Sequence, residues 1–340
     1  MKKKFEDPKF FWNTAHEYLN RELPDIRQKS ANTVKAYRES LNQFIDYLET
    51  EKDIRRSKIS FKDFGRDNIR DFLSWMHKAQ RKAPKTINLR LTAVHSLLKF
   101  ASDEDRDIVP IYLDAKTVKG LTVQKKEIEY FERSQTKALL SCQNMDRKTE
   151  RRNRMVLILM YDSACRVDEI ARLKVGSLRL KAETPYVTLC GKGDKYRNVP
   201  LMDKTCVHLW KYLKEFHSAD DKDAPLFYAV THGSMHRLSS DTYEAILKSS
   251  ADACKENGID MPSHAFTHML RKSRAMDLYQ EGMPLAHIQE LLGHEHVSTT
   301  SGFYAFATLS TLAKSLESAH GGNDDGEWMT GCDLEKLLRL

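Results

Sequence analysis

The chain has 340 residues, 41% of them hydrophobic and 30% charged, with a formal net charge of +7 at pH 7. This is more than one small module needs, and it predicts two packed domains. The charge is uneven: residues 1–126 hold 27 Lys and Arg against 18 Asp and Glu, and the remainder holds 28 against 30. A front half with this excess suits a polyanion such as DNA, because each cation that neutralises a phosphate releases counterions. An ordinary solvated surface is the alternative.

Export and membrane insertion are not expected. The N-terminal sequence MKKKFEDPKFFW is basic but has no apolar run of signal-peptide length, and the longest apolar run, residues 155–161, is far shorter than the roughly 20 residues of a membrane span. The six cysteines form no CxxC pair and no regular framework, which favours a reducing compartment. We therefore expect a soluble, cytoplasmic protein.

The front half reads as helical. Apolar residues at helical spacing predict helices over residues 33–49, 67–78 and 86–101, the first with Ser30 or Asn32 as its N-cap. The first hundred residues thus resemble a compact bundle of about four helices without strands. Residues 114–129 are polar, lack a clean period and contain a glycine, which predicts a linker and a domain boundary near residue 120.

The second half mixes helices and strands. Residues 151–173 are predicted to be helical, and residues 186–190 alternate like a strand that turns through Gly-Lys-Gly-Asp-Lys into a partner strand at 197–201. Helices are expected to dominate from about residue 204. A Gly-rich break follows at residues 321–326, and residues 333–340 (DLEKLLRL) predict a short amphipathic helix that must dock on something to be stable.

Candidate chemistry lies in four short motifs, SACRVDEI, GKGDKYRNVP, HMLRK and LLGHEHVSTTSGFY. Each has an ordinary explanation when taken alone: a surface ion pair, a hairpin turn, a packed histidine, a helix C-cap, a core tyrosine. Together and in this order they supply a set of candidate catalytic residues, Arg166, Lys192, His268, Arg271, His294 and Tyr304.

This ordered set resembles the tyrosine recombinases, also called the phage integrase family, whose catalytic domain carries an Arg, a β-hairpin Lys, His-x-x-Arg, a His or Trp, and a nucleophilic Tyr. The likeness covers about residues 30 to 310. It implies a mainly α fold with a small β-hairpin (α+β), arranged as a two-domain C-shaped DNA clamp. The parts would be a helical core-DNA-binding domain (1–115), a linker (116–130), a catalytic domain (131–320) and a tail (321–340).

Three departures from the family pattern are present. The interval from His294 to Tyr304 is one residue longer than the commonest pattern, Lys272 stands where a His often follows the second Arg, and Cys165 stands where Gly is frequent. None of them removes a core catalytic group.

The residue types suit phosphodiester transfer. Two guanidiniums, Arg166 and Arg271, can clamp the non-bridging oxygens on which negative charge develops. Ionising a phenol at pH 7 costs about 4 kcal/mol without help, so His268 is the candidate base for Tyr304. Lys192, with Lys195 as its substitute, is the candidate acid for the leaving 5′-oxygen. His294 would donate a hydrogen bond to the phosphate, as the family's His/Trp position does, and Glu169 is interpreted as structural, orienting Arg166.

The resemblance implies transesterification through a 3′-phosphotyrosyl intermediate, without ATP or a metal. The sequence has no Walker loop, no acidic cluster spaced for two metals and no Cys/His quartet, so no cofactor is expected. The implied partner is double-stranded DNA with inverted-repeat core sites, bound by a homotetramer on synapsed DNA and by a monomer or dimer before synapsis, in action at the bacterial nucleoid. DNA contacts are expected from Lys85, Arg90, Lys99 and Lys195, and the tail helix is expected to pass to a neighbouring subunit or to fold back on its own domain.

Several functions fit the motif set. The leading prediction is a mobile-element integrase or transposase, and a Xer-like resolvase of chromosome dimers or a DNA invertase are the alternatives. A type IB topoisomerase would relax supercoils without exchanging strands between two sites. A non-catalytic DNA-binding protein on the same scaffold would not need Tyr304.

Overall fold

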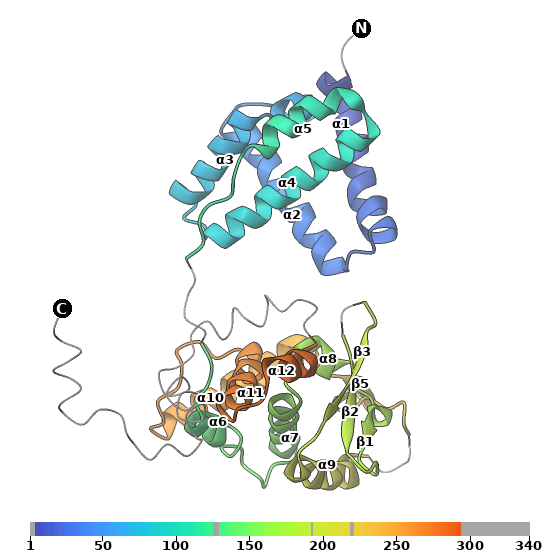
Figure 1. The fold of residues 1–340 in the computed structure, drawn as a ribbon, viewed down its shortest axis with the longest axis vertical. Coiled ribbons are helices and arrows are strands. Elements are labelled where there is room, and N and C mark those ends of the chain that lie inside the picture. The colour runs from blue at the N-terminus through green and yellow to red at the C-terminus, as the bar shows by residue number, and fades with distance from the viewer. Residues whose placement is uncertain (1–3, 125–128, 192, 218–220, 294–340) are drawn as a thin grey trace, which may run out of the picture. The chain divides into compact units, whose positions relative to one another are not determined.

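The computed structural model describes residues 4–124, 129–191, 193–217 and 221–293. The chain divides into two compact units, Met1–Lys126 and Glu127–Leu340. Both are built mainly of helices, with small antiparallel sheets in the second (Figure 1), which confirms the predicted fold class. Over the described ranges, none of the helices has the length and apolar character needed to span a bilayer.

The first unit is a helical bundle around an aromatic core. Its elements are the 3₁₀ turn η1 (Lys4–Glu6), α1 (Pro8–Glu17), the π-helical η2 (Tyr18–Ile26), α2 (Ala31–Thr50), the 3₁₀ turns η3 (Arg56–Lys58) and η4 (Phe61–Phe64), α3 (Arg66–Lys78), α4 (Pro84–Glu104), η5 (Arg106–Ile108) and α5 (Val109–Lys116). Phe44 at the centre meets Phe64 and Phe72 edge-on, with ring centroids 4.8 and 5.0 Å away. Such edge-to-face contacts stabilise a core beyond the burial of area alone.

The three helices predicted in this unit are confirmed as α2, α3 and α4, and no strand occurs in its described residues. The Ser30 hydroxyl caps α2 by accepting a hydrogen bond of 3.3 Å from the Thr33 N–H. Part of the stretch expected to be a linker is packed instead. The helix α5 runs to Lys116, and Asn88 exchanges two hydrogen bonds with the backbone of Leu121, at 2.7 and 2.8 Å.

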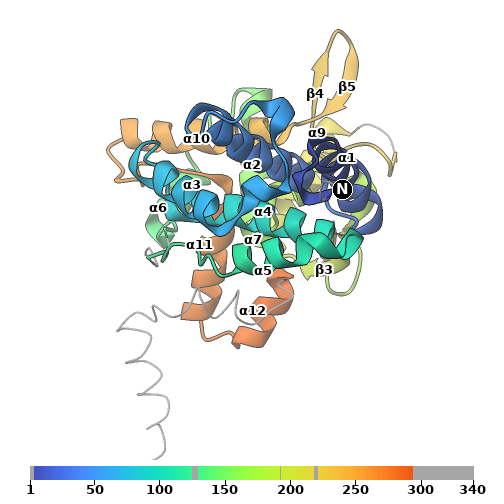
Figure 2. The ribbon, with the colours of Figure 1, turned by 90° about the horizontal axis from the view of Figure 1, so that it is seen from above.

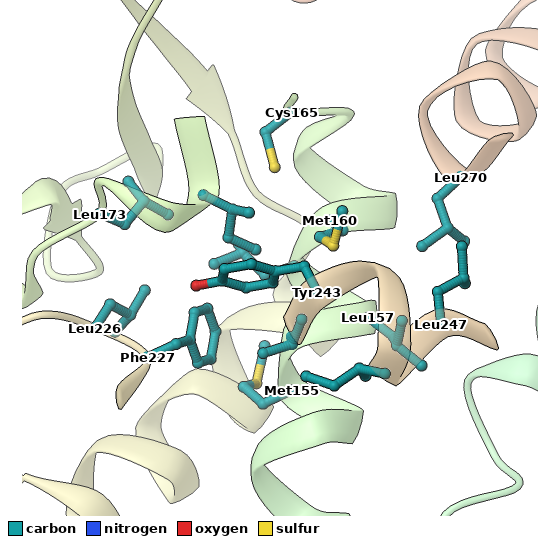
Figure 3. Close-up of a cluster of buried hydrophobic side chains, with 14 of the residues drawn as sticks. Met155, Leu157, Met160, Cys165, Leu173, Leu226, Phe227, Tyr243, Leu247 and Leu270 are labelled. Atoms are coloured by element: carbon teal, nitrogen blue, oxygen red, sulfur yellow. The ribbon is translucent and has the colours of Figure 1, made fainter. Parts of the chain in front are cut away.

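The second unit surrounds the central helix α7. Its elements are α6 (Arg133–Leu139), α7 (Lys148–Ser163), α8 (Val167–Ala171), the 3₁₀ turn η6 (Val175–Ser177), β1 (Leu178–Arg179), β2 (Tyr186–Cys190), β3 (Tyr196–Pro200), α9 (Asp203–Phe216), β4 (Tyr228–Thr231), β5 (Ser234–Arg237), α10 (Ser240–Glu256), α11 (Thr267–Gln280) and α12 (Leu285–Leu292). In Figure 1, α7 lies between α10 and α11 on one side and the sheet of β1, β2 and β3 on the other. Figure 3 shows the core there, where Met155 and Leu157 of α7 lie near Tyr243 and Leu247 of α10.

The sequence predicted one of the two sheets and not the other. The hairpin of β2 and β3 is confirmed, with Val187 paired to Val199 and Leu189 paired to Arg197, and β1 adds a third antiparallel strand. Helices dominate the described residues after 204, as predicted, but the hairpin of β4 and β5 among them was not predicted. It projects from its unit (Figure 2) and turns through His232 and Gly233, both at positive φ. Because β5 is exposed on both faces, no apolar alternation marked it in the sequence.

Candidate active site

Arg166 lies at a break between two helices and not within one. The predicted helix over residues 151–173 was wrong at this point, because α7 ends at Ser163 and α8 begins at Val167. Ala164 adopts the left-handed conformation with φ 47°, which is unfavourable for a residue other than glycine. Its carbonyl accepts a hydrogen bond of 2.7 Å from Nη1 of Arg271, a tertiary contact that helix propensity cannot foresee.

Glu169 holds Arg166 in place. One carboxylate oxygen accepts a hydrogen bond of 2.7 Å from the Arg166 N–H, and the other accepts one of 2.9 Å from its Nη1. The carboxylate is 3% exposed and also pairs with Arg197. Burial alone would raise the pKa of Glu169, but the hydrogen bonds and charges of the two arginines outweigh burial and lower it to about 2. Glu169 is therefore an anion that orients cations, not a base.

Arg271 is the second guanidinium of the site. It projects from α11, is 2% exposed, and donates to the carbonyls of Ala164 at 2.7 Å and Leu292 at 2.5 Å. Burial, and then the charge of Arg166, lowers its pKa to about 9, so the side chain stays protonated at neutral pH. An arginine has five N–H donors, and these two bonds leave others for a ligand.

His268 lies one turn before Arg271 on α11. Desolvation, and after it the positive charges of Arg271 and its neighbours, lowers the pKa of His268 to about 4. Part of the His268 side chain remains exposed to solvent. His268 is thus neutral at pH 7 and can accept a proton.

The C-terminal end of α12 closes the site. Gly293 caps this helix in the left-handed conformation, φ 61°. Its carbonyl accepts a hydrogen bond of 3.4 Å from Nη2 of Arg166, next to the Leu292 carbonyl that Arg271 contacts. The two arginines therefore meet at the helix end from which the chain continues toward His294 and Tyr304, which lie outside the described residues together with Lys192 and the predicted helix at 333–340.

The hairpin that carries Lys192 is anchored beside Glu169. The N–H of Gly191 donates to the carbonyl of Lys195 at 2.8 Å, and Gly193 and Asp194 adopt positive φ, which makes the turn tight. A Cβ on Gly191 would lie 3.4 Å from Oε1 of Glu169. The base of the turn therefore packs against the group that orients Arg166. Lys195 is exposed.

The three basic residues expected to contact DNA in the first unit differ in exposure and in their partners. Lys85 and Lys99 are exposed, and Lys99 pairs with Asp103 one turn along α4. Arg90 is half-buried and donates to Ser40 at 2.8 Å and Gln43 at 2.9 Å, so its guanidinium joins α4 to α2. That engagement gives Arg90 a packing role that the spacing of apolar residues did not indicate.

Other nucleophiles near the site are suppressed by burial. Tyr243 is completely buried in the core (Figure 3), and desolvation raises its pKa. Tyr161 donates a hydrogen bond of 2.6 Å to Asp277, and its pKa is raised as well. Burial raises the pKa of the Cys165 thiol to about 11. Among the residues with assigned positions, no group of three His, Cys, Asp or Glu side chains is arranged to hold a metal ion.

Sequence reasoning overlooked Arg197. Its signal was present: the alternation of β3 places Arg197 on the same face as buried Val199, and a cation on an inward face requires partners.

Comparison with known families gives two matches. Residues 129–309 match the model of the phage integrase family, and residues 16–105 match that of the phage integrase N-terminal SAM-like domain.

Individual proteins similar to this chain are recombinases or integrases. The tyrosine recombinase XerD of Oceanobacillus iheyensis is 30% identical over 299 residues, which are 86% of this chain and 94% of that protein. A putative integrase/recombinase, y4rC, of Sinorhizobium fredii is 28% identical over 86% of this chain and 87% of its own length.

Two solved structures share the fold. The XerH site-specific recombinase, bound to a palindromic difH substrate in a post-cleavage complex, has a TM-score of 0.67 at 22% identity, covering 91% of this chain and 88% of that one. The Tn1549 transposon integrase in complex with transposon right end DNA has a TM-score of 0.65 at 18% identity, covering 91% of this chain and 98% of that one.

Proposed function

Since the chain belongs to the phage integrase family and is a site-specific tyrosine recombinase, we propose that it cleaves and rejoins DNA with Tyr304 as its nucleophile. The observation that carries this assignment is the meeting of Arg166 and Arg271 at the end of α12. Arg166 directly precedes α8 and Arg271 belongs to α11. The chain runs from their meeting point into the segment that holds His294 and Tyr304.

The roles follow from the chemistry of each group. Arg166 and Arg271 bind the non-bridging oxygens of the scissile phosphate and stabilise the charge that develops there. His268, neutral at pH 7, takes the phenolic proton as the oxygen of Tyr304 attacks phosphorus.

The second half of the step concerns the leaving group. The bond from phosphorus to the 5′-oxygen breaks, and that oxygen receives a proton from Lys192, with Lys195 as the substitute donor. His294 donates a hydrogen bond to the phosphate. Resealing is the reverse reaction: a 5′-hydroxyl of the partner strand attacks the 3′-phosphotyrosyl bond, loses its proton to the lysine, and Tyr304 regains its proton from His268.

The proposed substrate is double-stranded DNA with inverted-repeat core sites. XerH and the Tn1549 integrase are solved on DNA, and a lambda integrase tetramer is solved on a Holliday junction. By analogy we assign residues 1–115 to core-DNA binding, 116–130 to the linker that lets the two domains clamp the duplex, and 131–320 to catalysis. A homotetramer would act on synapsed DNA, with residues 321–340 exchanged between neighbouring subunits.

The site of action that we propose is the cytoplasm, at the chromosome. The five cysteines with assigned positions are all free thiols, as a reducing compartment maintains them.

The biological role that we favour is integration or transposition, with Xer-like resolution of chromosome dimers or DNA inversion as alternatives. Both integrases and Xer recombinases are among the similar proteins. Plasmids that carry two sites in direct or inverted orientation distinguish resolution from inversion. Relaxation of a single-site plasmid without exchange would indicate a type IB topoisomerase activity instead.

The covalent intermediate tests the proposal. We expect the protein, incubated without metal with nicked suicide duplexes from DNA that flanks its gene, to form a protein–DNA adduct on a denaturing gel. Tyr304→Phe should abolish the adduct, because the phenylalanine has no oxygen to attack phosphorus. The control is Tyr196→Phe, which removes the hydroxyl of a tyrosine that is 71% exposed on β3 and should leave the adduct intact. An adduct that persists in Tyr304→Phe would contradict the assignment.

A further inference from the structure

Arg197 is a largely buried cation of the second unit to which the proposed reaction assigns no role. It lies on β3 opposite Leu189 of β2, and its side chain is 14% exposed. An arginine withdrawn from water to this degree requires strong partners.

The partners of Arg197 occupy each of its three guanidinium nitrogens. Nη1 and Nη2 donate to the two carboxylate oxygens of Glu169 at 2.7 and 2.8 Å, a bidentate pair. Nε donates to the carbonyl of Leu291 at 3.0 Å. Arg197 thus joins the group that orients Arg166 to the last turn of α12.

The end of α12 is held by three arginines from three separate elements. Arg197 of β3 donates to the carbonyl of Leu291. Arg271 of α11 donates to the carbonyl of Leu292. Arg166, the N-cap residue of α8, donates to the carbonyl of Gly293. The last carbonyls of a helix have no partners within it and form the negative end of its dipole, so cations bind there favourably. Consecutive carbonyls bound by three different elements fix both the position and the rotation of the helix end.

Two glycines enclose the Arg197–Glu169 pair. A Cβ on Gly293 would lie 3.0 Å from Cδ of Arg197 and 3.1 Å from its Nη1, closer than side chains normally approach. A Cβ on Gly191 would lie 3.4 Å from Oε1 of Glu169 and 3.7 Å from Nη1 of Arg197. Each glycine comes directly before a proposed catalytic residue, Lys192 or His294.

We propose that Arg197 is a positioning residue that sets the point at which the chain leaves α12 for Tyr304, relative to the arginine clamp. This inference rests on the proposed function of Tyr304. The three bonds to Glu169 and Leu291 hold the guanidinium against the end of α12, so we assign it no contact with the phosphate. Its loss should therefore impair attack by Tyr304 and spare the activation of phosphate by Arg166 and Arg271.

Comparing Tyr304 with hydrogen peroxide as the nucleophile separates an effect on tyrosine attack from an effect on phosphate activation. With the nicked suicide duplex, we expect Arg197→Lys to lower the single-turnover rate of adduct formation by at least about tenfold, since small misplacements of a reacting group cost factors of this size. The dissociation constant for the duplex should stay within about threefold, because affinity comes mainly from phosphate contacts elsewhere. In a Tyr304→Phe background, with hydrogen peroxide as a diffusible nucleophile, Arg197→Lys should cleave as fast as its parent.

Two further variants keep the test decisive. Arg151→Lys is the matched control, because Arg151 also makes a bidentate pair, with Glu215 at 2.6 to 3.1 Å, but between α7 and α9. It should leave the rate of adduct formation unchanged. Gly293→Ala keeps the charges, crowds the Arg197 side chain and strains the left-handed cap of α12. It should therefore disturb the same helix end and reproduce the pattern of Arg197→Lys even where that variant folds poorly.

The outcomes are distinct. If the unmodified protein forms an adduct that Tyr304→Phe abolishes, while Arg197→Lys and Gly293→Ala form it at the normal rate, the positioning inference alone is overturned. Equal losses with tyrosine and with peroxide would also overturn it, since they would place Arg197 in phosphate activation. Absence of any adduct from the unmodified protein would overturn the proposed function and this inference with it.

Discussion

The two units carry their positive charge in different ways. The first has 27 basic against 18 acidic residues, with cations such as Lys85 on its surface around an aromatic core. The second has a small acidic excess, yet it buries Arg271 and largely buries Arg197 around one buried carboxylate. Net charge therefore identifies the unit suited to hold a polyanion, whereas the proposed chemistry needs a few cations whose positions are fixed by backbone carbonyls and Glu169.

The largest effect is expected at the buried clamp. Arg271→Lys removes the forked donor that joins Ala164 to Leu292 and that we propose binds the phosphate. The single-turnover rate of adduct formation should therefore fall by about 100-fold or more. Quench-flow or manual time courses on the suicide duplex at saturating DNA measure this rate. Lys85→Gln, in the first unit, should leave the rate at saturation unchanged, and equal losses in both variants would break the distinction between the units.

Substitution of Glu169 is expected to have an intermediate effect, which concerns the stability of the fold. Removing the buried anion leaves Arg166 and Arg197 without their partner, so Glu169→Gln should lower the free energy of unfolding at pH 7 by about 3 kcal/mol. The folded pKa of about 2 is below the ordinary 4.5. The carboxylate therefore stabilises the fold fully above about pH 4.5, and this contribution is lost as the pH falls toward 2.

Urea unfolding at several pH values measures both parts of that prediction. The stability of the unmodified protein should approach that of Glu169→Gln as the pH falls from 4.5. Glu215→Gln is the control, because its pair with Arg151 is one-third exposed and should contribute less than about 1 kcal/mol. A constant difference between the unmodified protein and Glu169→Gln from pH 7 to pH 3 would contradict the low pKa.

The smallest effects are expected on the surface of the first unit. Lys85→Gln should weaken DNA binding a fewfold and reduce the slope of log affinity against log salt by about 1, as expected for one lost phosphate contact. Arg90→Gln should instead lower the melting temperature of the protein and leave that slope nearly unchanged, because its guanidinium is committed to α2. Titrations of fluorescent duplex at several salt concentrations test both, and the reverse result would show that Arg90 faces the DNA.

Sequence periodicity was sufficient where packing is amphipathic. The helices α2, α3 and α4 place one apolar stripe on the core, and the hairpin of β2 and β3 has its glycines at the turn, so both were predicted. Periodicity failed where tertiary contacts override local preference. Nothing in the composition of residues 160–168 marks the break at Ala164. The carbonyl of Ala164 accepts a hydrogen bond from Arg271, which lies more than a hundred residues away in the sequence.

The order of the motifs was enough to select the candidate residues. It did not predict how their side chains are arranged. That order identified Arg166, His268 and Arg271, which the structure brings together. It gave no weight to Arg197, because a lone arginine in a strand is ordinary until its partners Glu169 and Leu291 are known.

The buried thiol of Cys165 has a consequence for chemical selectivity. Cys165 precedes Arg166, and Figure 3 shows its sulfur pointing into the core. A thiolate is a stronger nucleophile than a phenol, and at the surface beside an arginine clamp it would compete for an activated phosphate. With its pKa raised to about 11, the sulfur stays protonated and turned inward. The fold thus leaves the attack on DNA to an oxygen nucleophile and keeps this sulfur out of reach of oxidants and alkylating reagents.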